Sequence, residues 1–154
     1  MEIAMSLPKT PSPTLYETDY LQWIETTLSK LQNQDYTNVD WENLIEEIAD
    51  MGRSERKSLK SNLIVILLHL LKWQFQPNQR SGSWESSIIE HRRRVQESLQ
   101  DSPSLQPYLE EIFTECYTQA VKQAKAETGL PRESFPVICP YHLQQVISDD
   151  FLPD

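Results

Sequence analysis

The chain has 154 residues, a formal net charge of −9, three Gly and ten Pro. This length fits one domain with a single core, and the scarcity of Gly disfavours a β-sandwich, which needs frequent glycine turns. Two Cys are too few for the disulfide framework of a small secreted protein. We therefore predict an all-α, single-domain helical bundle of about five main helices.

In chain order, residues 1–15 are polar and Pro-rich, and we expect a flexible arm there. Apolar residues at helical spacing then predict five helices, each bounded by Pro, Gly or a capping Ser or Asp. The expected ranges are about 16–32, 41–51, 54–76 and 103–128, with a fourth helix that Ser81 or Ser83 could cap and that reaches about residue 100. Gly52 is expected to end the second helix and Pro77 to end the third. The helical bundle would span 16–130.

The first two predicted helices each carry an apolar stripe of the kind that faces a core. These stripes include Leu21, Ile24 and Leu28 in the first helix, and Trp41, Ile45 and Ile48 in the second. Residues 131–154 form an irregular arm with one short helix from about Pro140 to Ile147. We expect this arm to pack on the bundle because Val137, Ile138 and the aromatic residues near them are too apolar for a free tail.

Residues 63–71 form the longest apolar run, interrupted by His69, and span about half the length that a membrane helix needs. We interpret this run as the centre of the bundle and expect no contact with a membrane. The N-terminus lacks the basic and apolar regions of a signal peptide, so we expect a cytoplasmic protein.

Charge is distributed unevenly along the chain. Residues 1–52 have a balance of −8, residues 53–94 of +6, and residues 95–154 of −7. Such alternation is typical of helices that complement one another at their surfaces, and it is also compatible with a basic patch for an anionic partner.

Several ordered segments resemble one known family. They are YETDY at 16–20, DWENLIEEIADMG at 40–52, HLLKWQFQP at 69–77, RSGSW at 80–84, SPSL at 102–105, ETGLP at 127–131, FPVICPY at 135–141 and DDFLP at 149–153. With these segments the chain resembles a bacterial family, abundant in cyanobacteria, called domain of unknown function 29. The resemblance spans nearly the whole chain and implies a helical fold in a bacterial cytoplasm. It carries no established activity, so no catalytic residue can be transferred.

A metal site is one hypothesis for the chemistry. Glu47 lies at the edge of an apolar stripe, His69 interrupts a central helix, and His91 lies on the apolar seam of the fourth predicted helix. Helical bundles build metal centres from such side chains on facing helices. Glu47, His69 and His91 are therefore candidate ligands of a divalent metal in a nuclease or hydrolase, although neither HExxH nor paired ExxH motifs occur.

Nucleic-acid or anion binding is another hypothesis. It rests on Lys72, Arg80, Arg92 and Arg93 in the basic segment 53–94, with Trp73 and Trp84 beside them. Basic side chains can neutralise phosphates while aromatic rings stack on unpaired bases. The alternative is that these cations pair with acidic helices and that the tryptophans fill the core.

The hypothesis that we favour is a non-catalytic binding or regulatory module without a cofactor, acting on a protein partner. No Gly-rich phosphate loop or GxSxG nucleophile motif is present in the sequence, and Cys116 lies on an apolar helical face. Whether the chain is an enzyme, and what its oligomeric state is, stay open at this point.

Overall fold

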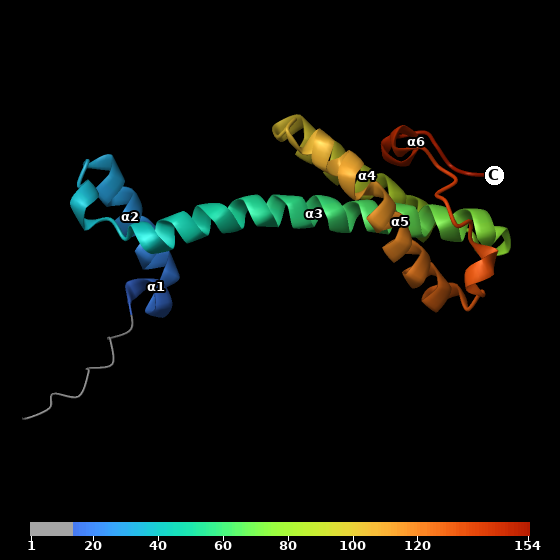
Figure 1. The fold of residues 1–154 in the computed structure, drawn as a ribbon, viewed down its shortest axis with the longest axis horizontal. Helices are drawn as coiled ribbons and strands as arrows, with labels where there is room; N and C mark the ends of the chain where they lie inside the picture. Colours follow the sequence, from blue (N-terminus) through green and yellow to red (C-terminus); the bar gives the residue numbers. More distant parts are fainter. Residues whose placement is uncertain (1–13) are drawn as a thin grey trace, which may run out of the picture. The chain divides into compact units, whose positions relative to one another are not determined.

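The computed structural model describes residues 14–154, and the expectation for the arm at 1–15 falls almost entirely outside them. Within that range the chain is all-α and has no strand, which confirms the predicted fold class (Figure 1). The helices are α1 (Leu15–Thr18), α2 (Tyr20–Gln32), α3 (Trp41–Phe75), α4 (Gly82–Asp101), α5 (Leu105–Thr128) and α6 (Leu143–Ile147). None of these helices is both long and apolar enough to cross a membrane.

Local capping explains most of the helix ends. The side chain of Asp19 accepts a hydrogen bond from the backbone N–H of Gln22 at 3.0 Å and caps α2. Ser81 caps α4 in the same way through the N–H of Trp84 at 3.3 Å. Gly129 ends α5 with a φ of 72°, in the left-handed region that favours glycine. These side chains satisfy backbone groups that a helix end leaves without partners.

Helix α3 differs from the expectation of two helices separated at Gly52. It runs without interruption from Trp41 to Phe75. A single Gly costs a helix only about 1 kcal/mol relative to Ala and keeps its backbone N–H, whereas Pro removes a bond of the ladder. Because Glu, Arg and Lys follow Gly52 and favour helix, the chain continues through it. Pro77 does follow the helix end, as predicted.

The described residues divide into two compact units. The division falls between Asp50 and Met51. Its cause is visible in the burial pattern: the described part of the first unit buries only Trp23, Thr27 and Val39, whereas nearly all of the core residues belong to the second unit.

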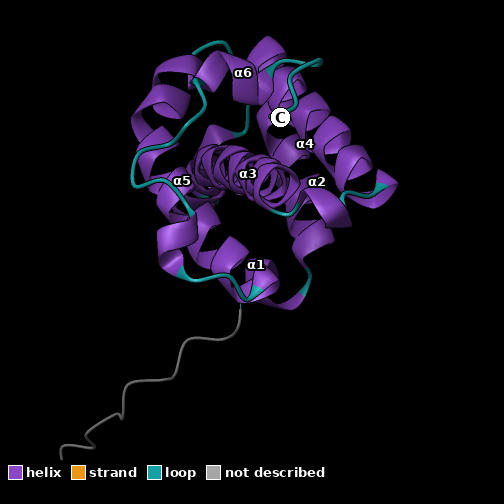
Figure 2. Ribbon diagram, turned by 90° about the vertical axis from the view of Figure 1, so that its right-hand side faces the viewer, coloured by secondary structure: helices purple, strands orange, loops and turns teal. Residues whose placement is uncertain are grey.

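The second unit has the core that the apolar run predicted. Its part of α3 lies between α4 and α5 in both ribbon views (Figures 1 and 2). The side chains of Leu63, Ile66, Leu67 and Leu70 are fully buried there. They pack with Ile88 and Val95 from α4 and with a set of buried residues from α5. Removing this apolar area from water is the main stabilising contribution to the unit.

The C-terminal arm lies on this core, with Phe135, Tyr141 and Val146 buried. Tyr141 also donates a hydrogen bond to the side-chain amide oxygen of Gln74 at 2.7 Å. Two residues depart from the expectation: Val137 and Ile138 are 85% and 83% exposed. Sequence hydrophobicity predicted burial for the whole segment, but the backbone of the arm turns these two side chains to solvent.

Candidate functional site

The first unit contains a small aromatic and acidic cluster. Tyr16, Tyr20 and Trp23 pack ring against ring, with centroids 4.9–5.9 Å apart. Glu47 of α3 accepts hydrogen bonds from the hydroxyl groups of Tyr16 and Tyr20, the latter at 2.6 Å. The carboxylate therefore joins the N-terminal helices to the start of α3. These two hydrogen bonds are packing contacts within the unit, and together they occupy both carboxylate oxygens of Glu47.

Asp40 makes a second such contact. Its carboxylate accepts hydrogen bonds from the indole N–H of Trp23 at 3.1 Å and from the side-chain amide of Asn43 at 2.7 Å. The hydrogen bonds from Asn43 lower the pKa of Asp40, and the bond from Trp23 adds to this effect. Asp40 thus stays ionised while it caps α3 by accepting a hydrogen bond from the backbone N–H of Asn43.

The hydrogen bond to Glu47 should be visible as a delayed titration of Tyr16. The hydrogen bond that Tyr16 donates to Glu47 raises the pKa of Tyr16 from 10.0 to about 12, and partial burial and the charge of Glu47 add to this effect. Glu47→Ala should return this pKa toward 10, measured by NMR of ring-labelled tyrosine. Because the folded pKa exceeds the unfolded one, the stabilisation is complete below about pH 10 and is lost as pH rises toward 12. An unchanged titration in the variant would contradict the hydrogen bond.

Most residues of the two apolar stripes predicted in this unit are exposed. Leu21, Ile24 and Leu28 of α2 are 64%, 38% and 52% exposed, and Trp41, Ile45 and Ile48 of α3 are 45%, 64% and 58% exposed. These residues form one exposed stripe on each of the two helices, and we call the two stripes the N-terminal apolar surface. Apolar side chains that a soluble protein leaves together in water often mark an interaction site.

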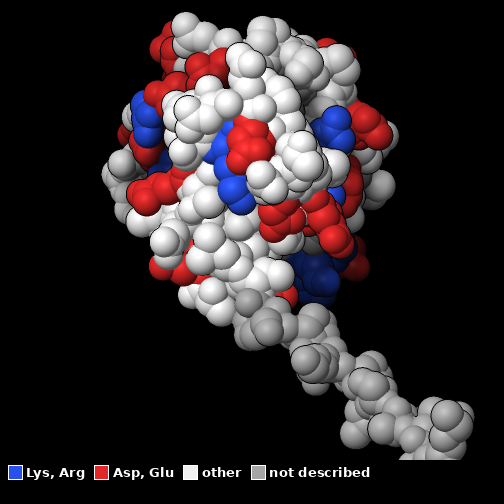
Figure 3. All heavy atoms as spheres, turned by 90° about the vertical axis from the view of Figure 1, so that its left-hand side faces the viewer, with Lys and Arg blue, Asp and Glu red and all other residues white. Residues whose placement is uncertain are grey.

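The same unit is strongly acidic. Residues 14–50 include nine Asp and Glu residues, and Lys30 is the one basic residue among them. Lys30 donates a hydrogen bond to the backbone oxygen of Asn38 at 2.8 Å. Figure 3 shows one face of the molecule, on which acidic groups lie among areas of uncharged surface with fewer basic groups. The unit therefore combines exposed apolar side chains with negative charge.

The predicted metal ligands are not brought together as a set. Across residues 14–154, no three His, Cys, Asp or Glu side chains gather in a way that could hold a metal ion. Glu47 lies near the N-terminal end of α3 in the first unit, where the two tyrosines engage it. His69 lies near the C-terminal end of α3, and His91 lies on α4, both in the second unit.

The two histidines have similar local geometry. Nδ1 of His69 lies 2.8 Å from the backbone oxygen of Val65, and Nδ1 of His91 lies 2.7 Å from that of Ser87. Because a carbonyl can only accept, each ring donates through Nδ1. Burial lowers the pKa of His69, and the charges of Lys72 and His91 add to this effect. This half-buried environment favours the neutral form of the His69 ring.

The residues predicted to bind anions are mostly engaged within the second unit. Lys72 forms an ion pair with Glu127 of α5 at 2.9 Å, and its ammonium lies 4.5 Å from the ring centroid of Trp84. Arg80 lies over the ring of Trp73 and donates a hydrogen bond to its backbone oxygen at 2.8 Å. The pairing of Lys72 with α5 is of the kind that the alternative interpretation expected. Trp73 and Trp84 are only partly buried and lie outside the buried core, which differs from that interpretation.

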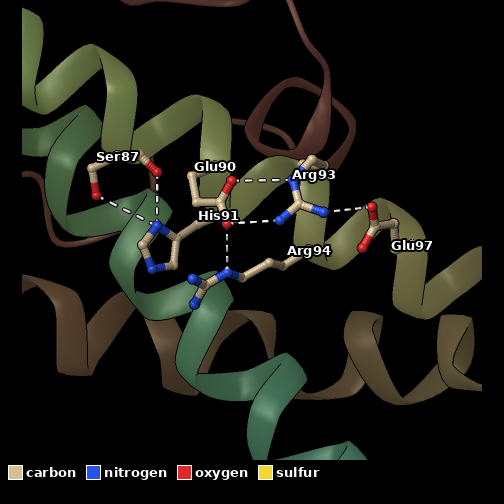
Figure 4. Close-up of polar contacts among 6 residues, drawn as sticks. All are labelled: Ser87, Glu90, His91, Arg93, Arg94 and Glu97. Carbon is tan, nitrogen blue, oxygen red and sulfur yellow. Dashed lines mark hydrogen bonds and ion pairs between the residues drawn. The ribbon is translucent and has the colours of Figure 1, made fainter.

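Arg93 and Arg94 pair with acidic residues of their own helix. Arg93 bridges Glu90 and Glu97 at 2.7 and 2.5 Å, and Arg94 contacts Glu90 at 3.0 Å (Figure 4). Hydrogen bonds from Arg93 and Arg94 lower the pKa of Glu90 to about 2. The positive charge of this part of α4 is thus largely compensated by carboxylates at helical spacing.

Arg92 has a different position from its two neighbours, because it is only 2% exposed. Its guanidinium donates hydrogen bonds to the backbone oxygens of Gln145, Val146, Asp149 and Phe151, at 2.7–3.4 Å. The side chain fixes the C-terminal arm to α4 and is not part of an exposed basic surface. Sequence reasoning missed this role because Arg-Arg-Arg runs are typical of solvated faces.

Both cysteines are free thiols with raised pKa values. Cys116 is fully buried in the core of the second unit, and burial raises its pKa to about 11. A thiol with such a pKa is protonated at neutral pH and is a poor nucleophile. This position is consistent with the packing role expected for Cys116.

Comparison with known proteins places this all-helical chain in a family. The family model described as "Domain of unknown function DUF29" matches residues 15–152, which is nearly the whole chain. The chain belongs to this family, which confirms the resemblance seen in its ordered motifs. No match to a curated protein or to a solved structure was found.

Proposed function

We propose that the protein is a non-catalytic binding module and that the N-terminal apolar surface is where it contacts a partner protein. The observation that carries this proposal is the exposure of that surface, with Ile45 and Ile48 of α3 64% and 58% exposed. A partner that covers these side chains would gain about 25 cal/mol for each Å² of apolar area removed from water. The proposal keeps the bacterial cytoplasmic setting that the family resemblance implies.

The small core of the first unit supports the same proposal. Residues 14–50 bury three side chains, and both cysteines of the chain lie outside this unit. A small unit buries little apolar area, and such units often depend on disulfides, a metal or association with another chain for stability. Of these three, association with another chain is the one for which the first unit offers an exposed apolar surface. Binding of a partner would also stabilise the unit, because it selects the folded state.

The test is a matched pair of single substitutions. Ile45 in the first unit and Ile89 on α4 in the second unit are 64% and 58% exposed, so Ile45→Glu and Ile89→Glu make the same chemical change at similar exposure. Wild-type, Ile45→Glu and Ile89→Glu proteins serve as baits in lysate of the native host. We expect a protein that wild type and Ile89→Glu retain and that Ile45→Glu loses.

The captured protein is then purified, and its affinity for each bait is measured. A Glu placed in an apolar contact should weaken binding at least tenfold, which is about 1.4 kcal/mol. Equal binding by all three baits, with the helix content of Ile45→Glu unchanged, would refute the proposed docking surface.

A further inference from the structure

We infer that the segment docking on the N-terminal apolar surface is a basic amphipathic helix of another protein. This inference rests on the proposed function and adds the chemical class of the partner. Two properties of the first unit carry it: the helical spacing of the exposed apolar residues and the negative charge beside them.

The spacing suits a helix as the occupant. Trp41, Ile45 and Ile48 follow one another at intervals of four and three residues, so they form one continuous stripe on α3. Leu21, Ile24 and Leu28 form an equivalent stripe on α2 at intervals of three and four. The grooves beside such a stripe accept the apolar ridge of a second helix at an interaxial distance of about 8–10 Å. Helix-in-groove recognition uses anchors at this spacing.

Acidic residues flank each stripe. At about 100° per residue, Glu25 lies roughly 70° from the centre of the α2 stripe, and Glu42 roughly 90° from the centre of the α3 stripe. Both residues are exposed. A docked helix with Lys or Arg beside its apolar ridge would place a cation against Glu25 on the α2 stripe or against Glu42 on the α3 stripe. Complementary charges at the rim steer association and exclude partners of the wrong sign.

The same charges disfavour the other occupants. The described part of the first unit carries −8, so two copies facing each other through this surface would bring together sixteen net negative charges. Nucleic acids and anionic lipid surfaces are repelled for the same reason. A basic helix is the occupant that satisfies both the apolar stripe and the charge of the unit.

The test uses two synthetic helical peptides with the same pattern of Leu, one with Lys and one with Glu at all other positions. Each peptide carries a fluorophore, and its anisotropy is measured as the full-length protein is added. We expect the Leu/Lys peptide to bind with an affinity that falls as salt rises, and the Leu/Glu peptide to bind at least tenfold more weakly.

A pair of charge reversals locates the binding. Glu25→Lys/Glu42→Lys changes the rim of the surface, and Glu110→Lys/Glu111→Lys makes the same change in net charge at exposed positions of α5. We expect the rim variant to bind the Leu/Lys peptide at least fivefold more weakly and the α5 variant to change affinity less than twofold. Ile45→Glu should also abolish binding.

Equal weakening by the two reversals, or equal affinity for the two peptides, would overturn the inference. Sedimentation supplies a further outcome: a wild-type dimer that Ile45→Glu converts to a monomer would show that a second copy covers the surface, which also overturns it. The peptide and sedimentation results bear only on the chemical class of the partner. The proposed function is tested separately by the capture experiment, and it is refuted if the Ile45→Glu protein still retains the captured protein.

Discussion

Arg92→Ala should lower the free energy of unfolding of the second unit by about 3 kcal/mol, because hydrogen bonds to charged groups are worth about 1.5–3 kcal/mol each and their carbonyl acceptors stay behind without partners. Arg92 is 2% exposed and donates to four carbonyls of the C-terminal arm. The substitution also leaves a cavity between α4 and the arm. Urea unfolding followed by circular dichroism measures the change.

The matched control for this prediction is the next residue of α4. Arg93 is exposed, and its contacts are surface ion pairs with Glu90 and Glu97. Such pairs contribute about 0–1 kcal/mol, so Arg93→Ala should change stability by less than about 1 kcal/mol. In limited proteolysis, the arm of Arg92→Ala should be cut near residues 148–152 faster than that of Arg93→Ala. Equal stability of the two variants would contradict the proposed role of Arg92.

Leu67→Ala should cost about 3 kcal/mol, and Ile45→Ala less than about 0.5 kcal/mol. Leu67 is fully buried on α3, whereas Ile45 is 64% exposed on the same helix. Removing a buried leucine loses transfer free energy and leaves a cavity, whereas an exposed apolar side chain loses neither. Ala is also the best helix former, which favours the Ile45 variant.

Amide hydrogen exchange measures the two units separately in the Leu67→Ala and Ile45→Ala proteins. We expect faster exchange in α4 and α5 for Leu67→Ala and unchanged exchange in α2 and the start of α3 for Ile45→Ala. A loss of protection in α2 with Ile45→Ala would mean that this side chain packs within the chain. The N-terminal apolar surface would then be part of the core instead of a docking surface.

Helix boundaries and the main core were predictable because they depend on local chemistry. The caps Ser81 and Gly129 act on backbone groups a few residues away, so their positions can be read from the sequence. The apolar run with Leu63 and Leu70 is long enough that only a buried helix suits it. Gly52 was misinterpreted because a helix tolerates one glycine when its neighbours favour the helix.

The exposure of the stripes could not be predicted from the sequence. Periodicity shows that Leu21, Ile24 and Leu28 share a face, but it gives the same signal whether that face meets the core or another molecule. The link between Tyr16 and Glu47 spans 31 residues, and the links from Arg92 to the arm span more than 50. Such contacts depend on tertiary packing. A weak signal for the surface was present in the acidic balance of residues 1–52.

Binding of a partner protein to the N-terminal apolar surface can be measured as the affinity of the captured partner for the Ile45→Glu and Ile89→Glu proteins. We expect at least a tenfold loss of affinity for Ile45→Glu and less than a twofold change for Ile89→Glu, with both proteins folded. Equal affinities for the two variants would contradict binding at this surface.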